Sequence, residues 1–209
     1  MSRWTTASAL KPELPPLHVV TDDATVARGD FLDVAREIVA EGGPDVALHL
    51  RAPSASGIAV YRFAEALRAI TRDAGALLLV NDRADVALAV DADGVQLGRR
   101  GLDAADARKL NGDRMIGVSA HSRDEAQADA DFLLVGHVYA TASHPGRDGI
   151  GPGALAGYSS PIIAIGGVTP ERVAELRAAG AHGIAAIRGI WDAPSPARAV
   201  RSYLREWRG

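Results

Sequence analysis

Residues 161–191 read PIIAIGGVTPERVAELRAAGAHGIAAIRGIW, and this stretch contains one complete structural unit followed by the start of another. The apolar run Ile162–Ile165 has the composition of a strand that is buried on both faces, as parallel strands are. Two glycines follow, and Thr169-Pro170 then supplies an N-cap and a proline at the first helical position. Gly180 ends the predicted helix, and another apolar run follows it. The stretch therefore predicts a strand, a helix and a second parallel strand.

The same order of apolar run, polar turn and helical stretch recurs along the chain from residue 17 onward. Amphipathic stretches such as residues 31–43 and 60–75 separate the runs, with apolar residues at three- and four-residue spacing. Ser122 followed by Glu125 indicates a capping box ahead of another helix. The eight predicted strands are Leu17–Thr21, Val46–Arg51, Ala76–Val80, Gly94–Leu97, Met115–Ser119, Phe132–Val135, Ile162–Ile165 and Gly183–Ile187.

Eight such units fit a single α/β domain. They predict a (β/α)8 TIM barrel over residues 17–209, at the short end of the range for this fold, with residues 1–16 as an N-terminal tail. A doubly wound open sheet is the competing architecture. The apolar outer helices and the segment 197–207 are compatible with a homodimer, although core packing explains them equally well.

The composition of the 209-residue chain excludes several kinds of chemistry. Because cysteine is absent, disulfides, thiol nucleophiles and zinc–thiolate sites are excluded. The two lysines are Lys11 in the tail and Lys109 in a polar helical stretch, so neither is placed for a Schiff base. A net charge of −3 gives no reason to expect nucleic acid or an anionic membrane as a partner. With no apolar run long enough to span a membrane and no signal peptide, we expect a soluble cytoplasmic protein.

The ends of the predicted strands carry the candidate site. In a (β/α)8 barrel the active site lies at the C-terminal ends of the strands and in the loops that follow them. Here these positions are polar, and they include arginines and three histidines, which predicts a site for a small anionic ligand. They are Thr21, Asp22, His49, Arg51, Asn81, Asp82, Gln96, Ser119, His121, His137, Thr141, Gly166, Gly167, Arg188 and Gly189.

The loops after the seventh and eighth strands predict a phosphate site. Gly166 and Gly167 allow backbone N–H groups to approach an anion closely, and Arg188-Gly189 can open a short helix. Phosphate binds at these two loops in many barrels. A tight turn is the alternative interpretation of the glycine pair, but its place beside Arg188 favours phosphate.

Two of the histidines near the strand ends admit different interpretations. His137 follows the sixth strand, and an imidazole there can take and return a proton. His49 alternates with leucines, so it should point into the barrel together with Arg51, either as a hydrogen-bonded core histidine or as a ligand contact. An inward arginine needs an anionic partner. We expect the glycine-rich loop around His144 to act as a mobile lid.

With these residues in place, the chain resembles the thiamine phosphate synthase superfamily, which contains the synthase and TenI, a thiazole tautomerase. Several matching motifs in the same order carry the resemblance over almost the whole barrel. They are LHVVTD at 17–22, VNDRADVALAVDADGVQLG at 80–98, GVSAHS at 117–122, GHVYAT at 136–141, AIGGVTPERV at 164–173 and IRGIW at 187–191.

The resemblance to the synthase has departures. The synthase joins a pyrimidine pyrophosphate to a thiazole phosphate and uses magnesium to neutralise the departing pyrophosphate. Pro53 stands where the synthase has a lysine after the second strand, and His144 replaces another lysine. Gly101 stands in place of a magnesium-binding aspartate, which leaves Asp82 as one ligand and Asp103 as a substitute for the other. These departures weaken the synthase interpretation.

The resemblance to the tautomerase is closer. It covers the pair His49 and Arg51 and the run Gly136-His137-Val138, and it implies that His137 is the catalytic residue. The main hypothesis is therefore a cofactor-free isomerase, with no metal, that aromatises a carboxythiazole phosphate. The resemblance also places a small residue where this chain has Arg188.

In this hypothesis His137 moves the proton as base and then as acid. The substrate phosphate binds at Gly166, Gly167, Arg188 and Gly189, and the rest of the substrate contacts His49, Arg51, Asn81, Ser119 and Thr141. Two alternatives stay open, namely thiamine phosphate synthase with Mg²⁺ and a non-catalytic protein that binds a thiazole phosphate.

Overall fold

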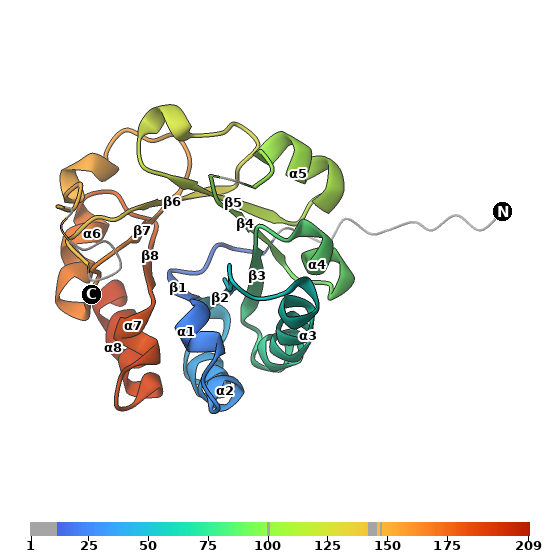
Figure 1. Ribbon diagram of the computed structural model, residues 1–209. Helices are drawn as coiled ribbons and strands as arrows, with labels where there is room; N and C mark the ends of the chain where they lie inside the picture. Colours follow the sequence, from blue (N-terminus) through green and yellow to red (C-terminus); the bar gives the residue numbers. More distant parts are fainter. Residues whose placement is uncertain (1–11, 100, 142–145, 147) are drawn as a thin grey trace.

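The computed structural model describes residues 12–99, 101–141, 146 and 148–209. It forms a closed barrel in which eight strands pair in parallel in chain order, as Figure 1 shows. The (β/α)8 prediction is confirmed, and each predicted strand ends within one residue of its observed limits. The strands are β1 (Leu17–Val20), β2 (Val46–Leu50), β3 (Leu77–Asn81), β4 (Gly94–Leu97), β5 (Met115–Ala120), β6 (Phe132–Gly136), β7 (Ile162–Ile165) and β8 (Gly183–Ala186).

Helices surround the barrel, and α8 packs against α2, so that the last unit adjoins the first (Figure 1). The α-helices are α1 (Asp23–Val26), α2 (Phe31–Gly42), α3 (Gly57–Ala74), α4 (Ala84–Ala89), α5 (Ala104–Asn111), α6 (Val173–Ala178), α7 (Arg188–Trp191) and α8 (Pro196–Arg208). Single 3₁₀ turns are η1 (Gly43–Asp45), η2 (Arg123–Glu125), η3 (Pro152–Leu155) and η4 (Pro170–Arg172).

The helical prediction after β5 is wrong. Among the described residues, the connections after β5 and β6 contain only the turns η2 and η3. Ser122 makes no side-chain cap, and the Glu125 carboxylate instead accepts the backbone N–H of His121 at 2.9 Å. The segment 123–131 offers only alanines as apolar residues, so a helix there would have no large side chains to bury against the barrel.

The strands are apolar on both faces because each face packs against a different layer. Their outer side chains join the large core beneath the helices, and their inner side chains form a smaller cluster inside the barrel. Inward-facing glycines make room for the largest of these inner groups. A Cβ on Gly117 would lie 2.2 Å from Cζ of Phe132, so this position has no space for a side chain.

The N-terminal end of the barrel carries two copies of one ion-pair arrangement. Asp93, just before β4, accepts the N–H of Leu78 at 2.8 Å and pairs with Arg68 of α3 at 2.8 Å. In the same way Asp131, just before β6, accepts the N–H of Ile116 in β5 at 2.7 Å and pairs with Arg108 of α5 at 2.8 Å. Each arrangement fixes a helix to the two strands that follow it in the chain.

The predicted tail, residues 1–16, lies largely outside the described residues. Within residues 12–16, the carbonyl oxygen of Pro15 lies 3.1 Å from Nε2 of His18. The carbonyl oxygen of Pro16 accepts the N–H of Ile184 at 2.8 Å. Leu14 packs against the inner cluster of the barrel. None of the described helices is long and apolar enough to cross a membrane.

Candidate functional site

A polar wall lines one side of the barrel mouth, at the ends of β3, β4 and β5. The strand register places Asn81 beside Gln96, and Gln96 beside Gly117. Nε2 of Gln96 donates to Oγ of Ser119 at 3.1 Å. Oδ1 of Asn81 and Oε1 of Gln96 are buried and accept no hydrogen bond from any described residue. Buried acceptors without donors cost about 1–3 kcal/mol each and mark a place where a donor-bearing ligand would be stabilising.

His49 lies deeper than this wall and is a hydrogen-bonded core histidine. It is fully buried, and its Nε2 lies 2.7 Å from Nδ1 of the equally buried His18. Phe132 packs against both rings. Burial lowers the pKa of His49 to about 3, so its imidazole is neutral at physiological pH. Of the two interpretations left open by the sequence, the structure therefore places His49 inside the core rather than at the mouth.

Arg51 lies just beyond the end of β2 and is exposed, so it does not need the internal anionic partner that an inward arginine would require. Its backbone holds the loop in place, because Oγ1 of Thr21 accepts the Arg51 N–H and donates to the Arg51 carbonyl, each at 2.8 Å. The Asp23 carboxylate accepts the backbone N–H of Ser54 at 3.0 Å and its hydroxyl at 2.8 Å. The loops after β1 and β2 are thus joined at the rim.

Asp82 stands at the rim after β3 with its backbone in the left-handed region, at φ 58°. Its N–H donates to the Gln96 carbonyl at 2.9 Å, and its Oδ1 accepts the N–H of Gly98 at 2.7 Å. A Cβ at Gly101 would lie only 2.8 Å from the same Oδ1. The absence of a side chain at residue 101 therefore allows the backbone after β4 to approach this carboxylate closely.

His137 follows β6, where a cis peptide bond joins it to Gly136. Its Nε2 lies 3.1 Å from the carbonyl oxygen of Asp148, and its own carbonyl accepts the N–H of Ile150 at 3.0 Å. Its Cβ lies against Gly166, where an added Cβ would be 2.3 Å away. The predicted catalytic histidine and the predicted phosphate-binding glycine are therefore in direct contact.

The rest of the loop after β6 is partly outside the described residues. Thr141 is half-buried at the edge of the described segment, and His144 lies outside it. The described return of the loop is held by the N–H of Gly151, which donates to the Val138 carbonyl at 2.9 Å. The prediction of a mobile lid stays a prediction.

The glycine loop after β7 is held from outside the mouth. The Gly166 carbonyl accepts the N–H of Tyr139 at 3.0 Å, and the Gly167 carbonyl accepts Nη1 of Arg172 at 2.5 Å. The next carbonyl, that of Val168, accepts the hydroxyl of Tyr203 in α8 at 2.9 Å. Three successive carbonyls thus have partners, whereas the N–H groups of Gly167 and Val168 have no acceptor among the described residues.

The loop after β8 carries the other two residues of the predicted phosphate site. Arg188 and Gly189 are exposed and begin α7, the short extra helix expected after the eighth strand of a barrel. Gly189 has no space for a side chain, because a Cβ would lie 2.4 Å from the hydroxyl of Tyr203. The predicted phosphate-binding residues therefore share Tyr203 as a common support.

Sequence reasoning missed the supporting side chains Tyr139, Arg172 and Tyr203. Tyr139 and Arg172 lie within the motifs at 136–141 and 164–173, but nothing in the local sequence shows that these side chains or Tyr203 contact the glycine loop. Their contacts to residues 166–168 arise only when the units come together around the barrel.

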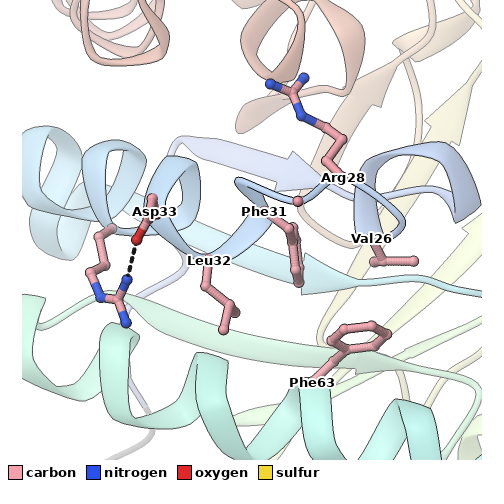
Figure 2. A pocket seen from close by; sticks show the side chains of 8 residues that line it. Val26, Arg28, Phe31, Leu32, Asp33 and Phe63 are labelled. Atoms are coloured by element: carbon pink, nitrogen blue, oxygen red, sulfur yellow. Dashed lines mark hydrogen bonds and ion pairs between the residues drawn. The ribbon is translucent and has the colours of Figure 1, made fainter.

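A separate pocket of about 390 Å³ lies outside the barrel (Figure 2). Phe31 and Phe63 meet edge to face, with ring centroids 5.6 Å apart. The charged side chains at its edge are paired, Arg36 with Asp33 at 2.6 Å and Arg28 with Asp30 at 2.8 Å. It is therefore not the candidate active site. Its lining is Val26, Arg28, Gly29, Phe31, Leu32, Asp33, Arg36 and Phe63.

The family model described as thiamine monophosphate synthase matches residues 17–190. The chain is 42% identical to the thiamine-phosphate synthase of Chlorobium luteolum, over 92% of this chain and 93% of that protein. It is 41% identical to the thiamine-phosphate synthase of Chloroflexus aurantiacus, over 90% and 92% of the two chains. A solved structure, the thiamine phosphate pyrophosphorylase from Pyrococcus furiosus, has a TM-score of 0.82 at 31% identity and covers 96% of this chain and 98% of its own.

These relatives correct the preference drawn from the sequence. The superfamily assignment is confirmed, whereas the names of the relatives support the synthase, which the sequence analysis kept as an alternative, and not the tautomerase. The departures at Pro53 and Gly101 favoured the tautomerase, whereas the proteins that this chain resembles along its whole length are named as synthases.

Proposed function

Because the chain belongs to the thiamine monophosphate synthase family, we propose that it is a thiamine-phosphate synthase, a transferase that joins a pyrimidine pyrophosphate to a thiazole phosphate. The observation that carries the proposal is the 42% identity to a protein of that name along more than nine tenths of both chains. In this reaction the thiazole nitrogen bonds to the methylene carbon of the pyrimidine, and the bond from that carbon to pyrophosphate breaks. The pyrophosphate takes the electron pair, so no redox partner is needed.

The polar wall supports the pyrimidine half of the proposal. An aminopyrimidine offers N–H donors, and Asn81 and Gln96 hold carbonyl oxygens that no described residue satisfies. Ser119, which accepts from Gln96, stands on the next strand of the same wall. We assign these three side chains to the pyrimidine ring, since pairing the two acceptors would remove their cost of burial.

The glycine loop supports the phosphate half. The N–H groups of Gly167 and Val168 have no acceptor among the described residues, and backbone amides of this kind bind phosphate in many barrels. Gly189 lies beside them at the start of α7, and Arg188 adds a positive charge. We assign the thiazole phosphate to these groups, and we assign the pyrophosphate to the exposed Arg51, which follows β2 on the same rim.

The described residues do not fit a magnesium site made of two protein carboxylates. Oδ1 of Asp82 already accepts a backbone N–H, and Gly101 supplies no ligand. Asp103 caps α5, where it accepts the N–H of Asp106 at 2.8 Å. No group of three His, Cys, Asp or Glu residues within the described segments is placed to hold a metal. No step of the proposal is therefore routed through a metal held by this chain.

A two-arm assay of the purified protein tests the proposal. One arm supplies the pyrimidine pyrophosphate and the thiazole phosphate, with magnesium as the counter-ion of pyrophosphate in solution. The other supplies a carboxythiazole phosphate tautomer without metal. We expect thiamine phosphate and one equivalent of pyrophosphate in the first arm, and a loss of turnover in Asn81→Ala. If no thiamine phosphate forms in the first arm, the proposal of synthase activity is refuted.

One observation keeps the thiazole tautomerase as a second candidate function. His137 is the residue that this activity requires, and its Cβ contacts Gly166 of the proposed phosphate site. In that case the second arm would show aromatisation that disappears in His137→Asn. For the synthase we expect His137→Asn to retain most of its turnover, because the transfer moves no proton.

A further inference from the structure

The glycine loop after β7 is oriented by partners that lie outside the barrel mouth. In a trans peptide the C=O and the following N–H point in opposite directions. The Gly166 carbonyl is directed at Tyr139 N, so the Gly167 N–H points away from the loop after β6. The Gly167 carbonyl is directed at the guanidinium of Arg172, so the Val168 N–H points away from η4. The orientation of a potential anion-binding amide is thus set by a side chain behind it.

Arg172 is itself held in place on two sides. Its guanidinium carbon lies 4.1 Å from the centroid of the Tyr139 ring, which is a cation–π distance. The Tyr139 hydroxyl donates to Oε2 of Glu175 in α6 at 2.6 Å. Burial and the bond to Glu175 raise the pKa of Tyr139 to about 12, so the hydroxyl stays protonated and keeps donating. Arg172 is therefore fixed between the glycine loop and a ring that is anchored to α6.

The contact with Gly167 also has an electronic effect. A positive charge on a carbonyl oxygen polarises the peptide group and makes its N–H a stronger hydrogen-bond donor. The peptide concerned joins Gly167 to Val168, and its N–H has no acceptor among the described residues. Arg172 thus contributes to anion binding without touching the anion.

We propose that Arg172 is a positioning residue for the substrate phosphate. It holds the Gly167 carbonyl away from the mouth and polarises the Val168 N–H, which binds the anion. The inference rests on the proposed function insofar as the anion is the phosphate of the thiazole substrate.

The test compares Arg172→Gln, Arg172→Lys and the control Arg177→Ala. Arg177 lies in α6 and donates to the Trp207 carbonyl, so the control removes a guanidinium from the same unit without affecting the glycine loop. Turnover is measured with the two substrates varied separately. Binding of the thiazole phosphate and of inorganic phosphate is measured by calorimetry, which needs no turnover.

For Arg172→Gln we expect a KM for the thiazole phosphate about tenfold higher, because the Val168 N–H loses its polarisation and its fixed orientation, with kcat and the KM for the pyrimidine changed less than about twofold. Calorimetry should show a similar loss for both phosphates. Arg172→Lys, which keeps the charge, should recover about half of the loss on a logarithmic scale, and Arg177→Ala should match the wild type.

Other outcomes overturn the inference. They are a wild-type protein that binds neither phosphate, an Arg172→Gln variant that binds both normally, or a variant that loses affinity for the two substrates equally together with thermal stability. Phosphate binding without thiamine phosphate formation would refute the proposed function alone. In that case the binding comparison between the wild type and Arg172→Gln still decides the role of Arg172.

Discussion

Nδ1 of His18 and Nε2 of His49 lie 2.7 Å apart inside the barrel, where both side chains are fully buried. Nε2 of His18 faces the Pro15 carbonyl at 3.1 Å and must carry its proton there, since a carbonyl can only accept. Nδ1 of His18 is then an acceptor, and Nε2 of His49 is the donor. Nδ1 of His49 remains a buried acceptor without a partner among the described residues.

This pair makes the stability of the barrel depend on pH. Burial lowers the pKa of His18 and brings that of His49 to about 3, below the value of about 6.5 in an unfolded chain. The unfolded state therefore takes up protons first, and stability is fully present above about pH 6.5 and is lost as the pH falls toward 3. Each histidine contributes up to about 1.4 kcal/mol per pH unit in this window.

Urea unfolding between about pH 7.5 and pH 5 measures this slope. We expect His49→Gln, which keeps a donor for His18, to reduce the slope by about half. Equal slopes in the wild type and His49→Gln would contradict the assignment.

The ion pair of Asp93 and Arg68 should matter more than surface pairs. Their side chains are only 19% and 16% exposed, and Asp93 also accepts the N–H of Leu78. Replacing Asp93 with alanine removes the acceptor of a strand N–H and leaves the mostly buried guanidinium with the 4.0 Å contact to Asp91, so we expect a loss of about 2–3 kcal/mol in the free energy of unfolding. The exposed pair of Asp33 and Arg36 serves as control, and Asp33→Ala should cost less than about 0.5 kcal/mol.

Gly117 is required by the size of Phe132. A Cβ at residue 117 would lie 2.2 Å from Cζ of Phe132 and 2.3 Å from Oε1 of Gln96. We expect Gly117→Ala to lower the free energy of unfolding by about 3 kcal/mol, and Phe132→Leu in that background to restore part of it, because the two changes are coupled. Gly153→Ala, where a Cβ would meet nothing within 4 Å, should be neutral. An additive double variant would argue against the contact.

Gly166→Ala should lower turnover by more than the backbone strain of the substitution explains. Gly166 has φ 97°, and a Cβ there would lie 2.3 Å from Cβ of His137. Gly180 has the same φ of 97° with nothing within 4 Å, so Gly180→Ala imposes the backbone strain without the collision. We expect Gly180→Ala to lose about 1–2 kcal/mol of stability and Gly166→Ala to lose more, because the collision adds to the strain, and we expect only Gly166→Ala to lose turnover, by at least about tenfold. Equal kinetics in the two variants would remove the assigned role of residue 166.

Much of the fold could be predicted because its signals are local. Strand limits such as Gly94–Leu97 follow from apolar runs, and Pro170 begins the helical stretch after β7 while Gly180 follows its end, although Thr169 makes no side-chain cap. The ends of the strands then lead to Asn81, Ser119, His137 and Gly166 as mouth residues, since strand order alone places them at one end of the barrel.

The tertiary structure decided which of these residues meet. The partner of His49 is 31 residues away on the neighbouring strand, and the alternation of β2 predicted an inward side chain without showing that His18 would satisfy it. A capping motif could not show that the helix after β5 is absent. Such a motif marks where a helix can begin, but the helix forms only where apolar side chains on it pack against the rest of the protein.

The sequence by itself determined a (β/α)8 barrel, because periodicity, caps and glycine positions act within a few residues along the chain, and its motifs carried the resemblance to the superfamily. Only the tertiary structure decided that His49 belongs to the core and that Arg172 holds the glycine loop. These contacts depend on how the strands are staggered and how the loops turn, and both are set by packing between units far apart in the sequence.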